Sequence, residues 1–276
     1  MARLDGKVAF VTGAARGMGR AFSVRLAAEG ADIVALDISA PIETVAYDLA
    51  TSDELDETVA LVEEAGGTAL AQRADVRDLE ELCAAVDAAL ERFGHIDILC
   101  ANAGIVTHGM AWEMSEETWL QTIDINLNGV WRTVKAVIPS MIERREGGSI
   151  IFTSSAAGLK GFPVISHYVA AKHGVVGLAR TLALELGEHN IRVNTVNPTV
   201  VGTPMVFNEP SYQAFVPDKP NPTKADVLEV YRELNVLPVD VIEPADVAAA
   251  VAWLASDDAR YVTGVSLPID AGNLQK

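Results

Sequence analysis

The sequence predicts an α/β fold, a doubly wound and mostly parallel seven-stranded sheet with helices on both faces. Short β-branched runs alternate with longer amphipathic stretches along all 276 residues, which is the pattern of repeated strand–helix–strand units. Several of the short runs are apolar throughout, as in VAFVT, DIVAL and IDILC. Such runs favour strands that are buried on both faces, as in a parallel sheet covered by helices.

The individual elements follow from the same patterns. A strand is predicted where a β-branched or apolar run is bounded by turn residues, and the seven runs are Val8–Thr12, Ile33–Asp37, Thr68–Arg73, Ile96–Cys100, Ser149–Thr153, Arg192–Asn197 and Val265–Pro268. Between these runs the apolar residues recur with helical period. That period predicts helices near 17–29, 52–65, 79–93, 116–142, 166–188 and 244–255.

The chain contains no internal repeat and no low-complexity linker, which favours a single domain over residues 1–276. Two connections are unusual. The segment Ile38–Thr51 is more than twice as long as the roughly 2–6 residues typical of such loops. The segment 199–223 holds five of the twelve prolines together with three aromatic residues. Long loops of this kind often close over a site, so we expect a substrate lid at about 199–223.

The composition excludes several classes of function. Lys and Arg number 21 against 38 Asp and Glu, which gives a net charge of −17. Such a surface repels nucleic acid and anionic lipid. The start of the chain lacks signal-peptide character, and no apolar run reaches the roughly 18 residues of a membrane span. The two cysteines, Cys83 and Cys100, lie in apolar stretches, which indicates core thiols in a reducing compartment. We therefore expect a cytoplasmic protein.

A glycine cluster follows the first strand and opens the first helix, with Gly13, Gly17 and Gly19 in the run TGAARGMGR. Such a turn lets backbone N–H groups at a helix N-terminus approach a diphosphate. Asp37 ends the second strand eighteen residues after Gly19, close to the position of the acid that binds an adenine ribose. A carboxylate there repels a 2′-phosphate, so the prediction is NAD rather than NADP, although Arg16 stands nearby.

A second group of polar residues predicts acid–base chemistry. Tyr168 and Lys172 are four residues apart in a helical segment and therefore share one helix face. A nearby cation can lower the pKa of a tyrosine, ordinarily near ~10, and so make it a usable acid or base. Ser155 follows the apolar strand residues IIF, where the active sites of open α/β sheets gather.

These motifs, in this order along nearly the whole chain, resemble the short-chain dehydrogenase/reductase family in its standard-length form. Thr12–Gly19 is similar to the cofactor loop of that family, and Ala101–Gly104 is similar to its Asn-Asn-Ala-Gly turn with alanine in the first place. Asn197-Pro198-Thr199 stands where the family usually has Asn-Pro-Gly. The resemblance implies a Rossmann-like fold, hydride transfer to or from NAD, and a homotetramer that packs the 116–142 and 166–188 helices against their mates.

The resemblance also implies roles for individual residues. Tyr168 exchanges the hydroxyl proton of the substrate and Ser155 orients its oxygen. Lys172 lowers the pKa of Tyr168 and binds the nicotinamide ribose, while Asn126 holds a proton-relay water. The residues expected to bind the cofactor are Gly13, Arg16, Gly17, Met18, Gly19, Asp37, Ile38, Asp75, Val76, Asn102, Ala103, Gly104, Tyr168, Lys172, Pro198, Val201 and Thr203.

A finer resemblance is to the actinobacterial carveol-dehydrogenase-like subgroup, which is linked to the redox carrier mycofactocin. It rests on the long Ile38–Thr51 connection, on TGAARGMGRAF and on Asn-Pro-Thr. It implies interconversion of a secondary alcohol, such as the cyclic terpenoid alcohol carveol, and its ketone. It also implies an external redox acceptor that reoxidises a retained NAD. The pocket is expected to be walled by mostly uncharged residues: His108, Met110, Phe162, Val164, Met205, Phe207 and Phe215.

Other functions remain open from the sequence. They are a 3-oxoacyl, steroid or polyol reductase of the same family, a non-catalytic nucleotide-sensing protein, and a dehalogenase-like lyase. The intact glycine loop, Asp37, Tyr168 and Lys172 argue against the last two. None of the five histidines has metal-ligand spacing to another ligand, so no metal is expected, and His167 is expected to pack.

Overall fold

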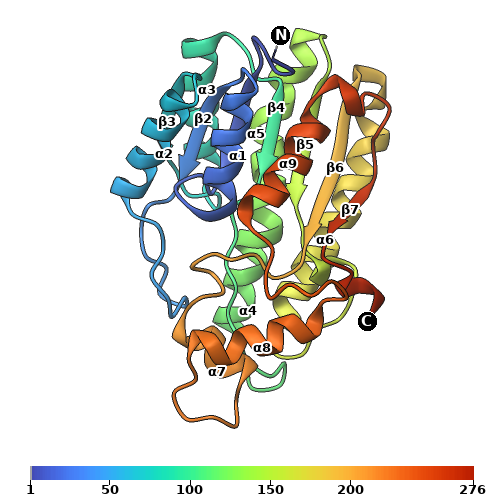
Figure 1. Ribbon diagram of the computed structural model, residues 1–276. Helices are drawn as coiled ribbons and strands as arrows, with labels where there is room; N and C mark the ends of the chain where they lie inside the picture. Colours follow the sequence, from blue (N-terminus) through green and yellow to red (C-terminus); the bar gives the residue numbers. More distant parts are fainter. Residues whose placement is uncertain (1) are drawn as a thin grey trace.

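Seven strands form the centre of the molecule in the order β3-β2-β1-β4-β5-β6-β7 (Figure 1). The computed structural model describes residues 2–276. All neighbouring strands pair in parallel, which confirms the predicted doubly wound sheet. The strands are β1 Val8–Thr12, β2 Asp32–Asp37, β3 Ala69–Arg73, β4 Ile98–Ala101, β5 Gly148–Thr153, β6 Ile191–Pro198 and β7 Ser266–Ile269.

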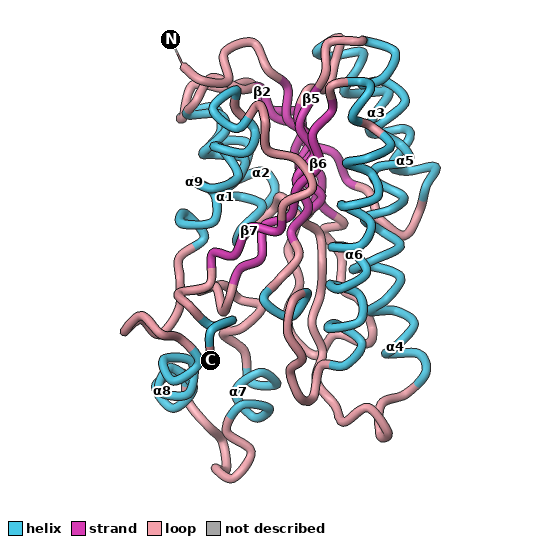
Figure 2. The backbone as a smooth tube through the Cα atoms, turned by 90° about the vertical axis from the view of Figure 1, so that its right-hand side faces the viewer, coloured by secondary structure: helices cyan, strands magenta, loops and turns pink. Residues whose placement is uncertain are grey.

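Helices cover both faces of the sheet. Figure 2 shows α1, α2 and α9 on one face and α3, α5 and α6 on the other. One apolar cluster lies under each layer, as expected for strands buried on both sides. The helices are α1 Gly17–Ala28, α2 Ser52–Glu64, α3 Leu79–Phe93, α4 Glu116–Ile123, α5 Gly129–Arg144, α6 Ser166–Glu185, α7 Glu209–Phe215, α8 Lys224–Leu234 and α9 Pro244–Ala255.

The predicted helix over 116–142 is interrupted. A π-helical turn, Asp124–Asn128, separates α4 from α5. The side chain of Asn126 explains the interruption, because its Nδ2 atom donates to the carbonyl oxygens of Thr122 and Ile105, at 2.9 and 3.0 Å. Such turns insert one extra residue and frequently mark functional positions.

Two helices, α7 and α8, were not predicted. The prolines of this region obscure them, although both have local start signals. Asn208 caps α7 by accepting from the N–H of Ser211 at 2.9 Å, and Pro210 lies in the first turn, where proline is tolerated. Thr223 and Asp226 form a capping box at the start of α8. The segment 199–223 is therefore partly helical rather than wholly irregular.

The expectation that both cysteines fill the core is wrong for Cys83, which is exposed. It lies beside the buried stripe of α3, which is formed by Leu82, Ala85, Val86 and Ala89. Cys100 is buried in β4, and burial raises the pKa of its thiol to about 12. Within residues 2–276, no helix has both the length and the apolar character needed to cross a bilayer.

Candidate active site

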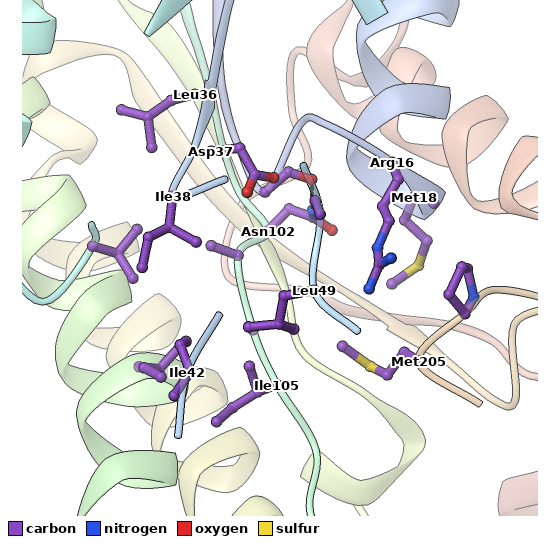
Figure 3. Close-up of a pocket in the computed structure, with 18 of the residues that line it drawn as sticks. Arg16, Met18, Leu36, Asp37, Ile38, Ile42, Leu49, Asn102, Ile105 and Met205 are labelled. Atoms are coloured by element: carbon purple, nitrogen blue, oxygen red, sulfur yellow. Dashed lines mark hydrogen bonds between the residues drawn. The ribbon is translucent and has the colours of Figure 1, made fainter. Parts of the chain in front are cut away.

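A cavity opens at the carboxyl ends of β1, β2 and β4 (Figure 3). Twelve of the residues predicted to bind a cofactor line it: Gly13, Arg16, Gly17, Met18, Asp37, Ile38, Asp75, Val76, Asn102, Ala103, Gly104 and Thr203. The parallel sheet brings them together because all its strands end at the same edge.

The start of α1 is built to receive an anion. Its N-cap residue, Arg16, makes no side-chain cap hydrogen bond, and its first turn contains no acidic residue. The first N–H groups of this helix are therefore left for another acceptor. Gly17 has a φ of +57°, and a Cβ atom there would come within 3.3 Å of the Thr203 methyl group. The glycine keeps the backbone open at the place where a diphosphate would lie.

Asp37 fits a ribose that carries free hydroxyl groups. Its carboxylate is buried and accepts from the N–H groups of Ala15 and Ser39, each at 3.1 Å. Burial raises the pKa of this carboxyl group, and the two backbone hydrogen bonds oppose that rise. The remaining lone pairs can accept from two ribose hydroxyls, whereas a 2′-phosphate would face a negative charge.

Arg16 does not offset that preference. Its guanidinium group donates to the backbone carbonyl of Asp48 and lies 3.9 Å from the Glu54 carboxylate. The cation is thus occupied by the 38–51 segment and the following helix. The polar groups at this end of the cavity, a carboxylate and an arginine that is already bound, fit NAD better than NADP.

The turn after β4 joins the cofactor cavity to a second polar group. Thr12 Oγ1 accepts from the N–H groups of Asn102 and Ala103, at 3.0 and 3.1 Å, which fixes this turn against β1. A Cβ atom on Gly104 would lie 2.6 Å from Asn126 Oδ1 and 3.7 Å from Lys172 Nζ. Gly104 therefore lets the backbone pass closely over the side chains of Asn126 and Lys172.

Tyr168 and Lys172 lie on one face of α6, as predicted. The Nζ atom of Lys172 is 5.4 Å from the centre of the Tyr168 ring and donates to the Thr153 carbonyl at 2.7 Å. Burial lowers the pKa of Lys172 to about 8. Burial also raises the pKa of Tyr168 to about 12, which a hydrogen bond to Ser155 partly opposes. The predicted lowering of the Tyr168 pKa by Lys172 is not found, because burial of the phenol dominates.

Ser155 and Asn126 are held by backbone contacts. The Ser155 hydroxyl accepts from the N–H of Ala157 at 3.1 Å, and its carbonyl accepts from Asn197 Nδ2 at 2.9 Å. The Oδ1 atom of Asn126 accepts from the N–H of Ile105 at 3.2 Å. The π-helical turn thus directs the amide of Asn126 at the loop that follows β4.

The segment Ile38–Thr51, which we call the strap, forms one wall of the cavity. Figure 3 shows Ile42 and Leu49 of the strap among the lining residues. Three contacts hold the strap to separate elements: Arg16 binds the Asp48 carbonyl, Thr44 binds Gln121 of α4, and the Tyr47 hydroxyl accepts from the N–H of Val106 at 3.3 Å. The predicted cofactor set omitted Tyr47, although its place in an apolar stretch of this long connection could have indicated it.

A sequence model described as short chain dehydrogenase matches residues 7–213. The chain belongs to the short-chain dehydrogenase family. Along its whole length it is 50% identical to (-)-trans-carveol dehydrogenase from Rhodococcus erythropolis, and the match covers 100% of both chains.

Two solved structures are also similar to this dehydrogenase. One is carveol dehydrogenase from Mycobacterium avium in complex with NAD, with a TM-score of 0.98 and 49% identity over 100% of both chains. The other is a short chain dehydrogenase from Mycobacterium paratuberculosis bound to NAD. It has a TM-score of 0.91 and 45% identity, and the match covers 99% of this chain and 100% of that one.

Seven of the predicted site residues lie outside the cavity lining. Gly19 is buried in α1 close to the Gly13 carbonyl, Pro198 ends β6, and Val201 is buried and bridges to Ile242. These three residues pack within the dehydrogenase behind the cavity wall and do not line the cavity. The other four are Asn126, Ser155, Tyr168 and Lys172, which lie beyond Gly104.

The residues predicted to wall a substrate pocket do not all line one cavity. Met205 lines the cofactor cavity, and the Phe215 ring of α7 meets the edges of His108 and Tyr231, at 6.2 and 4.8 Å between ring centres. Met110, in contrast, is 40% exposed. The aromatic contacts connect α7 and α8 to the loop after β4, at the end of the sheet where α6 begins.

Proposed function

We propose that this dehydrogenase interconverts a secondary alcohol, of the cyclic terpenoid class that includes carveol, and its ketone with NAD as hydride carrier. The observation that carries the proposal is the 50% identity to (-)-trans-carveol dehydrogenase along the whole chain. The site supports it, since the cavity that contains Asp37 reaches Lys172 through Gly104. Lys172 in turn lies beside Tyr168, which is hydrogen-bonded to Ser155.

NAD, when bound, accepts the hydride from the alcohol carbon at its nicotinamide ring. The glycine loop and the N-terminus of α1 would hold its diphosphate, and Asp37 its adenosine ribose. Tyr168 takes the hydroxyl proton during oxidation and returns it during reduction, while Ser155 holds the substrate oxygen by a hydrogen bond. Lys172 keeps a positive charge beside the Tyr168 ring, and Asn126 holds a water for proton exchange.

The pKa values indicate which protonation states Tyr168 and Lys172 have at neutral pH. With a pKa of about 12, Tyr168 carries its proton at neutral pH, so the protein is ready to donate to a ketone. Oxidation requires Tyr168 to lose that proton first. Lys172, with a pKa of about 8, is mostly charged at neutral pH.

The strap and the 199–223 segment are proposed to close the single domain over its ligands. The strap is anchored to Arg16, Val106 and Gln121, three points on different elements, and its apolar residues pack into the core. We infer that it covers the adenosine half of NAD and slows its release. Regeneration of a trapped cofactor then requires an external redox acceptor.

The proposed assembly is a homotetramer in the cytoplasm. Large apolar side chains remain exposed on the helices that would pair: Trp119 and Leu120 on α4, Trp131 on α5 and Leu184 on α6. Closed two-fold symmetry is the commonest arrangement of homo-oligomers.

The proposed function is tested with a panel of cyclic and linear secondary alcohols, carveol among them. Each is supplied with free NAD alone and with NAD plus a dye that accepts electrons. Formation of the ketone from cyclic alcohols supports the proposal. If no secondary alcohol is oxidised under either condition, the proposal is wrong.

A further inference from the structure

His108 lies in the loop after β4, and both of its neighbours are tied to the segment that carries Tyr168. Thr107 Oγ1 and His167 Nε2 are hydrogen-bonded at 2.6 Å. The N–H of Gly109 donates to the Val164 carbonyl at 2.8 Å. The backbone of His108 is therefore fixed relative to Tyr168 from both sides.

This attachment holds a strained backbone. Val164 has a φ of +59°, a left-handed conformation that is an outlier for a β-branched residue. His167 is fully buried, and its Nδ1 atom has no hydrogen-bond partner. Strain of this kind persists where the surrounding structure imposes it and collects at functional sites. The strained segment thus serves to hold the loop with His108 in a defined place.

The side chain of His108 is half-buried between α6 and α7. It meets the Phe215 ring edge-on and lies near enough to His167 for a charge there to lower its pKa. Within residues 2–276 no protein group hydrogen-bonds either of its ring nitrogens, and neither nitrogen is among the buried side-chain atoms that lack a partner, so both remain accessible to a ligand or to water. Burial lowers the pKa of His108 to about 4, so the ring is neutral at physiological pH, with one nitrogen as donor and the other as acceptor.

We propose that His108 binds a second, uncharged oxygen function of the substrate, such as a hydroxyl, ether or carbonyl oxygen remote from the reacting carbon. The inference rests on the proposed function. The reacting oxygen is already served by Ser155 and Tyr168, so a free imidazole on the side of the lid is available to another polar atom. A neutral ring beside the aromatic ring of Phe215 suits an uncharged oxygen better than a carboxylate.

The test compares two probes that differ only in the second oxygen, cyclohexanol and 1,4-cyclohexanediol, with NAD and a dye acceptor both present. In His108→Phe, we expect kcat/KM for the diol to fall by about 10- to 100-fold, as for loss of a buried hydrogen bond. The value for cyclohexanol should change less than about threefold, since the ring volume is kept. His108→Gln, which can still donate and accept, should retain more of the diol activity than His108→Phe.

The matched control is His173→Phe. His173 is exposed on α6, where its ring bonds only the Val169 carbonyl of its own helix, so both substrates should be unaffected. Equal losses on the two substrates in His108→Phe would assign the residue to packing and overturn the inference, as would no loss on either. A wild type that oxidises cyclohexanol but shows no preference for the diol also overturns it. A wild type that oxidises no secondary alcohol overturns the proposed function instead.

Discussion

The Nζ atom of Lys172 donates a 2.7 Å hydrogen bond to the carbonyl oxygen of Thr153. This bond ties α6 to the end of β5, two residues before Ser155. Within residues 2–276, the Thr153 carbonyl is the one protein acceptor for the buried ammonium group of Lys172. Two of the three Nζ protons therefore remain available to a ligand. Lys172 thereby sets the position of α6 and presents a charge beside Tyr168.

The rate of ketone reduction with NADH should depend on the charge of Lys172. Burial lowers the pKa of this amine to about 8, so the cation is present below that pH and lost as the pH rises through it. Tyr168, with a pKa of about 12, keeps its proton throughout. We expect kcat/KM to be constant below about pH 7 and to fall by up to about tenfold per unit above about pH 8. Lys172→Arg keeps the charge and should remove the fall. A wild-type profile that stays flat to about pH 9.5 would contradict this assignment.

Tyr168→Phe removes the exchangeable proton and keeps the ring. Turnover should fall by about 10²- to 10⁴-fold, the usual contribution of acid–base catalysis, while cofactor binding changes little. Steady-state kinetics and NAD titration measure the two effects. Tyr261→Phe is the control, since Tyr261 is 89% exposed. A Tyr168→Phe variant that keeps most of its turnover would show that another group exchanges the proton.

Asp37→Ala should weaken the preference for NAD over NADP. The carboxylate is held by the N–H groups of Ala15 and Ser39 and would face a 2′-phosphate at close range. Removing that repulsion should lower the ratio of kcat/KM for NAD to kcat/KM for NADP by at least about tenfold. Two charges about 4 Å apart interact by several kcal/mol near a protein surface. Asp53→Ala, at an exposed position in α2, is the control. A wild type that prefers NADP would refute the cofactor assignment.

The purified protein should retain NAD(H), because the strap is anchored at three points over the cavity. Ultraviolet absorbance and mass analysis of the nucleotide released on denaturation measure the retention. Tyr47→Phe removes the hydrogen bond to Val106 and should raise the dissociation rate of NAD by about tenfold, the effect of one buried hydrogen bond. Tyr261→Phe should release NAD as slowly as the wild type. A protein that is purified empty and turns over rapidly with free NAD would reduce the strap to an ordinary loop.

Light scattering at micromolar concentration should report a tetramer. Trp131 on α5 is 46% exposed, and Trp131→Arg places a charge in the proposed interface. We expect this variant to shift to smaller species, because an unpaired charge is costly in a buried contact. Tyr261→Arg, at a position that is 89% exposed and lies outside the paired helices, makes the same change from a neutral aromatic side chain to a cation and serves as the control. A wild type that is a stable monomer excludes the proposed assembly.

The sequence predicted best those features that depend on local chemistry. The strand β1 was predicted with its observed bounds because its apolar run stops at a glycine turn. The same holds for α3, which Asp78 caps and Gly94 ends with a φ of +83°. Helices α7 and α8 were missed although they have local start signals, but two other missed features depend on parts of the chain that are distant in sequence. The π-helical turn depends on Asn126 reaching Ile105, and the raised pKa of Tyr168 depends on burial. The spacing of motifs along the chain predicts neither which distant residue Asn126 contacts nor how deeply Tyr168 is buried.

The pairing of β1 has a consequence for biosynthesis. One edge of β1 pairs with β2, nearby in the chain, but the other pairs with β4, where Ala9 is opposite Ile98. A ribosome adds about 5–20 residues per second, so the second edge of this apolar strand stays open for several seconds while the intervening chain is made. An open apolar edge can pair with another nascent chain. Slower initiation, which spaces the ribosomes on a message farther apart and so keeps nascent chains apart, should therefore raise the soluble yield of this protein.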